Sequence, residues 1–113
     1  MPDSTVSHPY GETVDVIINK KGKSFALIGY LTTAIINSIK KGYSSEVSMN
    51  DGDIFITLKC PPELIYVLRD QYQAIVPGYY SNKNHWNTII VNKDVPHEEL
   101  LKMIALSHDA TSQ

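Results

Sequence analysis

Side chains that can bind a nucleic acid gather in two short polar segments of this sequence. The first segment, residues 20–23, holds three lysines, and the second, residues 81–85, leads into a tryptophan. Lysine neutralises a phosphate as a point charge, and asparagine bonds phosphate oxygens or the edge of adenine. A tryptophan that stays exposed can stack on a base. The candidate nucleic-acid-binding residues are Lys20, Lys21, Lys23, Asn82, Lys83, His85, Trp86 and Asn87.

Each of these residues also has a purely structural explanation. Lysines in turns are commonly just solvated, and asparagine tolerates the left-handed conformations that turns require. His85 can fix its own turn by bonding to the backbone. Trp86 stands at the start of a predicted strand, where tryptophan commonly anchors a core. The sequence therefore leaves both the binding and the structural interpretation open.

Catalytic chemistry finds little support in the residues. Cys60 precedes two prolines at a predicted strand-to-helix junction, where a helix N-terminus can lower a thiol pKa; a buried, inert thiol is the alternative. A small pocket that joins Cys60, His85 and Trp86 is a further hypothesis. The sequence holds no glycine-rich phosphate loop beside a parallel βαβ unit and no recognisable nucleophile triad. We predict that the protein is not an enzyme.

The acidic and histidine residues lack the spacing of a metal site. Asp51-Gly52-Asp53 is too short for a calcium loop. His8, His85, His97 and His108 are scattered, and no pair among them has the spacing of metal ligands. We expect neither a metal nor any other cofactor.

Composition describes a globular chain rather than a strongly basic one. Its 113 residues have the length of one domain, with 42% hydrophobic and 19% charged residues. The formal charge of −2 means that any nucleic-acid surface must be local, and it disfavours tight non-specific binding. No apolar run approaches the roughly 20 residues that span a bilayer, and residues 1–10 lack the features of a signal peptide. We expect a cytoplasmic protein in which the single cysteine forms no intramolecular disulfide.

The first half of the chain predicts two hairpins and one helix. Residues 1–10 resemble a loose arm. Two β-branched segments flank Lys20-Lys21-Gly22, which predicts a hairpin, and Asp51-Gly52 predicts a second one. A helix is indicated by isoleucines at helical spacing before two lysines and a glycine. The predicted ranges are 12–19 and 23–30 for the first hairpin, 32–41 for the helix, and 46–49 and 54–59 for the second hairpin.

The second half predicts two helices and two strands. Pro61 and Pro62 open one helix, whose apolar stripe comprises Leu64, Ile65, Leu68 and Tyr72. Pro96 starts the other helix, with Glu98 and Glu99 in its first turn. Strands are predicted over residues 74–80 and 86–92. Residues 1–113 are therefore expected to form a single α+β domain, an antiparallel sheet with segregated helices.

Several stretches of the chain resemble, in the right order, the MmcQ/YjbR family. The most specific is residues 77–88, in which Asn82-Lys83, one variable residue and His85-Trp86 follow a proline-containing segment. Further matching stretches are Leu58-Lys59-Cys60 with Pro62-Glu63, residues 95–100 with Ser107, residues 8–11, and residues 22–27. Together the matches cover most of the chain.

The resemblance implies a fold grouped with the frataxin-like (CyaY-like) α+β folds, and it implies DNA binding. Two polar turns with lysines could act as paired wings on double-stranded DNA. Members of the family usually begin with a helix that this sequence lacks. One face of the predicted sheet would then be uncovered, and a partner chain could cover it. The alternative to DNA binding is therefore a protein–protein interaction or homodimerising module without a nucleic-acid function.

Overall fold

In the described part of the chain, six strands form one antiparallel sheet, and three helices pack around it. The computed structural model describes residues 5–7, 14–78, 82 and 84–111. Neighbouring strands follow the order β1-β2-β3-β4-β6-β5, and every pair is antiparallel. This confirms the predicted α+β class. The elements are β1 Thr5–Ser7, β2 Val14–Ile18, β3 Ser24–Tyr30, α1 Thr33–Gly42, β4 Ile54–Lys59, α2 Pro62–Gln71, β5 Ile75–Pro77, β6 Trp86–Ile90 and α3 His97–Thr111.

The first predicted hairpin and the helix that follows it are confirmed. Gly22 has a φ of 81° in the turn between β2 and β3, a conformation that glycine adopts without a steric penalty. Helix α1 begins after Thr32, whose side-chain oxygen accepts the Ile35 N–H at 3.2 Å, and it ends with Lys40 and Lys41 in its last turn. Local sequence signals are sufficient for both elements.

The second predicted hairpin is wrong, because residues 46–49 form no strand. Instead, the backbone of Leu31 bonds to both Gly52 and Asp53, at 2.8 and 2.6 Å. These bonds return the chain directly to the end of β3, so that β4 pairs with β3 on one side and with β6 on the other. Met49 is buried and closes this loop over the core.

The loose-arm prediction is also wrong for the three residues Thr5–Ser7, which pair with β2. They extend the sheet by one edge strand, β1. The remaining residues of the predicted arm lie outside the described part of the chain.

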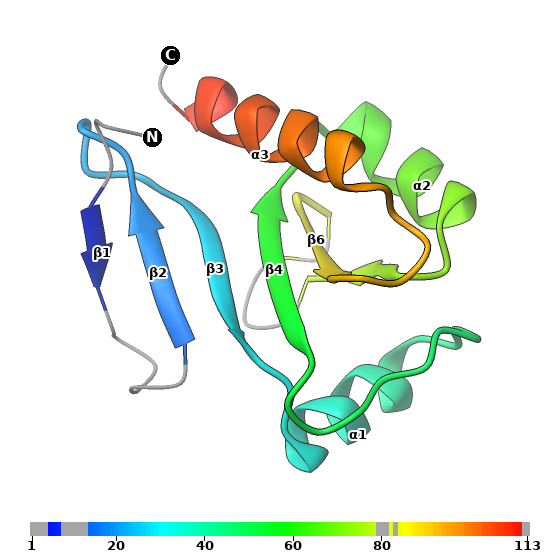
Figure 1. Ribbon diagram of the computed structural model, residues 1–113. Helices are drawn as coiled ribbons and strands as arrows, with labels where there is room; N and C mark the ends of the chain where they lie inside the picture. The colour runs from blue at the N-terminus through cyan, green and yellow to red at the C-terminus, as the bar shows by residue number, and fades with distance from the viewer. Residues whose placement is uncertain (1–4, 8–13, 79–81, 83, 112–113) are drawn as a thin grey trace.

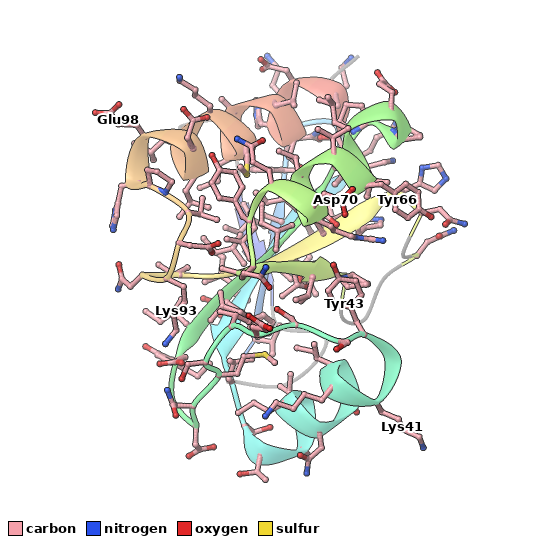
Figure 2. All side chains as sticks on the ribbon, turned by 90° about the vertical axis from the view of Figure 1, so that its right-hand side faces the viewer. Lys41, Tyr43, Tyr66, Asp70, Lys93 and Glu98 are labelled. Atoms are coloured by element: carbon pink, nitrogen blue, oxygen red, sulfur yellow. The ribbon has the colours of Figure 1, made fainter. Side chains whose placement is uncertain are left out.

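Helices α2 and α3 cover one face of the sheet. Ile54, Ile56 and Leu58 alternate along β4 and share that face, as predicted. Leu58 lines a pocket together with Leu68 of α2 and Met103 of α3, so both helices pack over it. Figure 1 shows α2 and α3 together, with α1 at the opposite end of the molecule, and Figure 2 shows the same separation from the side.

The predicted apolar stripe of α2 needs one correction. Ile65 is fully buried, and Leu68 and Tyr72 are partly buried against the core, but Leu64 is exposed. Besides Ile65, the other buried residue of α2 is Arg69, which the predicted stripe did not include. Arg69 follows Ile65 by four residues and so lies on the same helix face, although an arginine is rarely buried unless it is paired.

Ile65→Ala should lower the free energy of unfolding by about 2–5 kcal/mol, because it leaves a cavity beneath α2. Val67→Ala on the exposed side of the same helix is the matched control, and it should change stability by less than about 0.5 kcal/mol. Urea unfolding of both variants checks the expectation. Equal losses would mean that α2 does not dock through Ile65.

Candidate nucleic-acid interface

The two predicted polar segments lie at the same end of the sheet. Ile18 pairs with Ser24 next to the lysine turn, and Lys59, at the end of β4, pairs with Trp86, at the start of β6. Strand β3 therefore begins where β4 ends and β6 begins. Since β4 alone separates β3 from β6, the two segments start about 10 Å apart across the sheet. In Figure 1 the lysine turn and the end of β4 are both at the top.

The lysine turn is held in one conformation by Asn19. The Asn19 side-chain oxygen accepts the backbone N–H of Lys21 at 2.9 Å and that of Lys23 at 3.2 Å. The Asn19 amide nitrogen donates to the Thr111 hydroxyl at 3.1 Å, which ties the turn to the last turn of α3. Lys20, Lys21 and Lys23 are all exposed. The three charges are thus presented on an anchored loop.

The second segment is a turn built by asparagines. The Asn82 side chain accepts the Asn84 N–H at 2.9 Å, and the Asn82 carbonyl accepts the His85 N–H at 3.1 Å. The Tyr66 hydroxyl of α2 donates to the Asn84 side-chain oxygen at 3.3 Å. Asn82 and His85 are exposed and remain available to a ligand. Lys83 lies outside the described residues.

Asn87 was predicted to contact DNA, and the structure removes it from the candidate set. It is only 2% exposed. Its oxygen accepts from Arg69 Nε at 2.7 Å, and its nitrogen donates to the Ile65 carbonyl at 3.2 Å. Because both ends of the amide are engaged beneath α2, Asn87 serves the fold instead of a ligand.

Trp86 is half-buried and packs against the core. The Gly78 N–H donates to its carbonyl at 3.0 Å, and a Cβ built on Gly78 would lie 2.7 Å from the Trp86 Cβ. Only a glycine at position 78 lets these two backbone segments approach so closely. Trp86 therefore anchors the core through its backbone and the buried part of its side chain. The exposed part of the side chain stays a candidate contact.

Sequence inspection missed four residues that belong to this end of the molecule. Lys59 is exposed at the end of β4, whereas Asn19, Tyr66 and Arg69 act by holding the two turns. Arg69 could have been found from its helical spacing to Ile65. The Asn19–Thr111 bond joins residues 92 positions apart, and no local pattern predicts it. By contrast, Lys40 and Lys41 lie on α1, at the opposite end (Figure 2).

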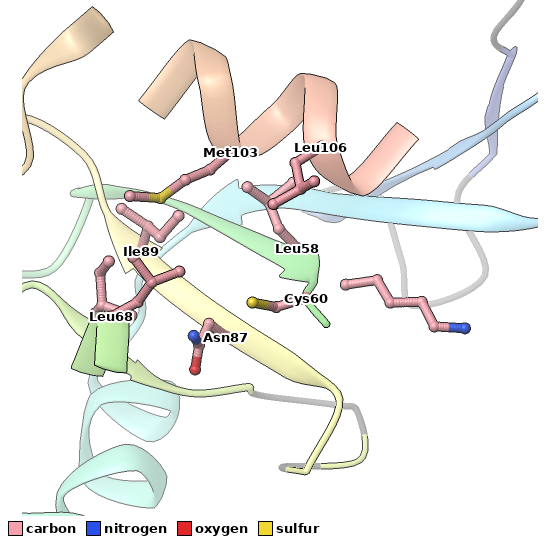
Figure 3. A pocket seen from close by; sticks show the side chains of 9 residues that line it. Leu58, Cys60, Leu68, Asn87, Ile89, Met103 and Leu106 are labelled. Carbon is pink, nitrogen blue, oxygen red and sulfur yellow. The ribbon is translucent and has the colours of Figure 1, made fainter. Parts of the chain in front are cut away.

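Cys60 lies in a small apolar pocket beneath α2 and α3. The pocket measures about 290 Å³ including its open mouth, and Figure 3 shows the thiol among Leu58, Leu68, Met103 and Leu106. Burial raises the pKa of Cys60, and the Glu63 carboxylate raises it further. The structure therefore favours the buried thiol over the activated one. The described residues that line this pocket do not include His85 or Trp86, so this pocket does not join the three side chains.

No metal centre emerges from the part of the chain that the structure describes: it holds no group of three histidine, cysteine, aspartate or glutamate residues close enough to bind an ion. In the same residues, no helix is long and apolar enough to cross a bilayer.

The chain belongs to the YjbR family, whose model matches residues 1–110. It is 38% identical over 56 residues to the uncharacterised protein YyaQ of Bacillus subtilis, a match that covers 50% of this chain and 47% of that protein. It is 30% identical over 53 residues to the uncharacterised protein YjbR of Escherichia coli, covering 47% and 45%. The matched part is thus about half the length of these relatives.

Two solved structures share the fold over nearly the whole chain. A Pseudomonas syringae protein has a TM-score of 0.73 at 25% identity, and the match covers 96% of this chain and 87% of that one. Protein DR2400 of Deinococcus radiodurans has a TM-score of 0.74 at 25% identity, covering 100% of this chain and 71% of that one.

The Cys60 thiol should react slowly with iodoacetamide at mildly alkaline pH. Its raised pKa keeps it protonated in the folded state, whereas the unfolded thiol ionises at its ordinary pKa. Below that ordinary pKa, the thiol is protonated in both states and does not affect the free energy of unfolding. As the pH rises further, only the unfolded state loses the proton, so the free energy of unfolding falls. Mass spectrometry of the protein with and without denaturant checks the rates. Equal labelling rates in the two conditions would contradict a buried thiol.

Proposed function

We propose that this protein is a non-enzymatic module that binds double-stranded DNA through the lysine-bearing end of its sheet. The observation that carries the proposal is the meeting of the lysine turn and the Asn82–His85 turn at one end of the sheet. Both turns project beyond the strand ends and could lie against two stretches of phosphate backbone. The contacts proposed for this interface are Lys20, Lys21, Lys23, Lys59, Asn82, Lys83, His85 and Trp86.

The distribution of charge supports this interface despite the net charge of −2. The lysine end presents four exposed lysines among its described residues: Lys20, Lys21, Lys23 and Lys59. Asp53 and Asp94 lie at the other end of the strands, where Asp53 precedes β4 and Asp94 bonds the Ala74 N–H before β5. Part of the acidic charge that makes the net charge negative therefore lies away from these lysines.

The same charges limit the affinity. Glu63 in the first turn of α2 and Asp109 in the last turn of α3 lie toward the lysine end, so we expect modest binding dominated by phosphate contacts. Four lysine–phosphate contacts would weaken the observed affinity about 100-fold between 50 and 200 mM salt.

Lys20→Ala with Lys21→Ala should weaken binding to a blunt duplex at low salt and lower the salt-dependence exponent by about 2. Lys40→Ala with Lys41→Ala, on α1, makes the same change in net charge at the opposite end and should have little effect. Fluorescence anisotropy titrations at two salt concentrations compare the variants. No binding by the wild type at low salt, or equal losses in both variants, would contradict the proposal.

A homodimer is the second candidate function, favoured by an uncovered corner of the sheet. Tyr30 and Ile54 are cross-strand partners on the face that α2 and α3 cover, yet they are 56% and 41% exposed. Two large apolar side chains side by side at a sheet corner are typical of a contact surface. A second copy related by a two-fold axis would bring the same corner against itself.

Tyr30→Lys should shift such a dimer to monomer, because two lysines would then face each other across the axis. Val67→Lys, on the exposed side of α2, adds the same charge elsewhere and should leave the dimer intact. Sedimentation equilibrium at high protein concentration distinguishes the two variants. A wild-type protein that sediments as a monomer at every concentration removes this candidate.

A further inference from the structure

Among the described residues, Tyr66 is an exposed aromatic side chain that borders the candidate interface. It lies on α2, is 59% exposed, and bonds through its hydroxyl to Asn84 of the second turn at 3.3 Å. The neighbouring residue of that turn, His85, is exposed and accepts the Cys60 N–H through its carbonyl at 2.8 Å. Tyr66 therefore borders the end of the sheet that carries the lysines.

The Tyr66 ring is held in place although it faces solvent. The guanidinium carbon of Arg69 lies 5.1 Å from the ring centroid, and Arg69 is itself fixed by its bond to Asn87. A contact to the hydroxyl and a cation over one face restrain both torsions of the side chain. An exposed side chain that is already ordered loses little entropy when a ligand binds to it.

Charge around the ring selects the kind of group that can approach it. Glu63 and Asp70 lie three residues before and four residues after Tyr66, on the neighbouring turns of α2, and Figure 2 shows Asp70 beside Tyr66. Two carboxylates repel a phosphate from the ring, but they do not repel an uncharged planar base. The nucleic-acid backbone must therefore lie on the side of Lys59 and His85, with a base turned toward Tyr66.

We propose that Tyr66 is a stacking platform for an unpaired nucleobase, so that the preferred target is DNA with a single-stranded extension next to a duplex. This inference rests on the proposed DNA binding and narrows its substrate class. In a continuous duplex each base is stacked between its neighbours and has no face to offer. An aromatic side chain that stacks on one base strengthens binding by roughly 5- to 100-fold.

The test compares a blunt duplex with the same duplex carrying a three-nucleotide overhang, by fluorescence anisotropy at low salt. We expect the wild type to prefer the overhang by roughly tenfold. Tyr66→Leu should abolish this preference, whereas Tyr66→Phe, which keeps the ring, should retain most of it. Both variants lose the hydroxyl bond to Asn84, so they should share the same affinity for the blunt duplex. Val67→Ala, on the same exposed side of the helix, is the matched control and should behave like the wild type.

The possible failures can be told apart. Equal affinity for both DNAs, or a preference that survives Tyr66→Leu, overturns the stacking role while the blunt-duplex binding and its salt dependence remain. Absence of binding to either DNA overturns both the stacking role and the proposed function. Thermal unfolding of each variant ensures that a loss of preference does not reflect loss of the fold, because Tyr66 is exposed and its replacement should not unfold α2.

Discussion

The hydrogen bond from Arg69 Nε to the side-chain oxygen of Asn87, at 2.7 Å, joins helix α2 to the start of β6. Arg69 is the only arginine of the chain and is 8% exposed. Burial lowers the pKa of its guanidinium, so a charge in this position depends on hydrogen bonds to offset its lost hydration. Asn87 and the Trp86 carbonyl supply them. The segment that leads from the second turn into β6 is thereby fixed on α2.

Much of the candidate site follows from that attachment. Tyr66 stands one turn before Arg69 on the same helix and holds Asn84, while the backbone of His85 bonds to Cys60 at the end of β4. The most distinctive sequence stretch of the chain, Asn82 to Asn87, thus has two roles. Its last residue, Asn87, makes hydrogen bonds that hold α2 on the sheet. Asn82 and His85 are exposed and available to a ligand. The family membership is shown by the match of the YjbR model to residues 1–110, whereas DNA binding is a proposal about the exposed residues of this stretch together with the lysine turn.

Local chemistry accounts for what the sequence could predict. The glycine of the lysine turn, the cap at Thr32 and the prolines before α2 act within a few residues, and the elements that they predict are confirmed. The hairpin predicted around Asp51-Gly52 is wrong because the backbone of Leu31, about twenty residues earlier, hydrogen-bonds to Gly52 and Asp53. Asn87 was misassigned for the same kind of reason. Its partner, Arg69, comes from another element, and only the folded structure brings the two together.

A double-mutant cycle between Arg69 and Asn87 tests most directly whether this bond organises the site. The free energy of unfolding is measured for Arg69→Met, Asn87→Leu and the double variant. If the bond joins α2 to β6 as described, each single change should be strongly destabilising, and the double change should cost less than their sum, with a coupling energy of about 1–3 kcal/mol. Additive losses, within about 0.5 kcal/mol, would contradict it.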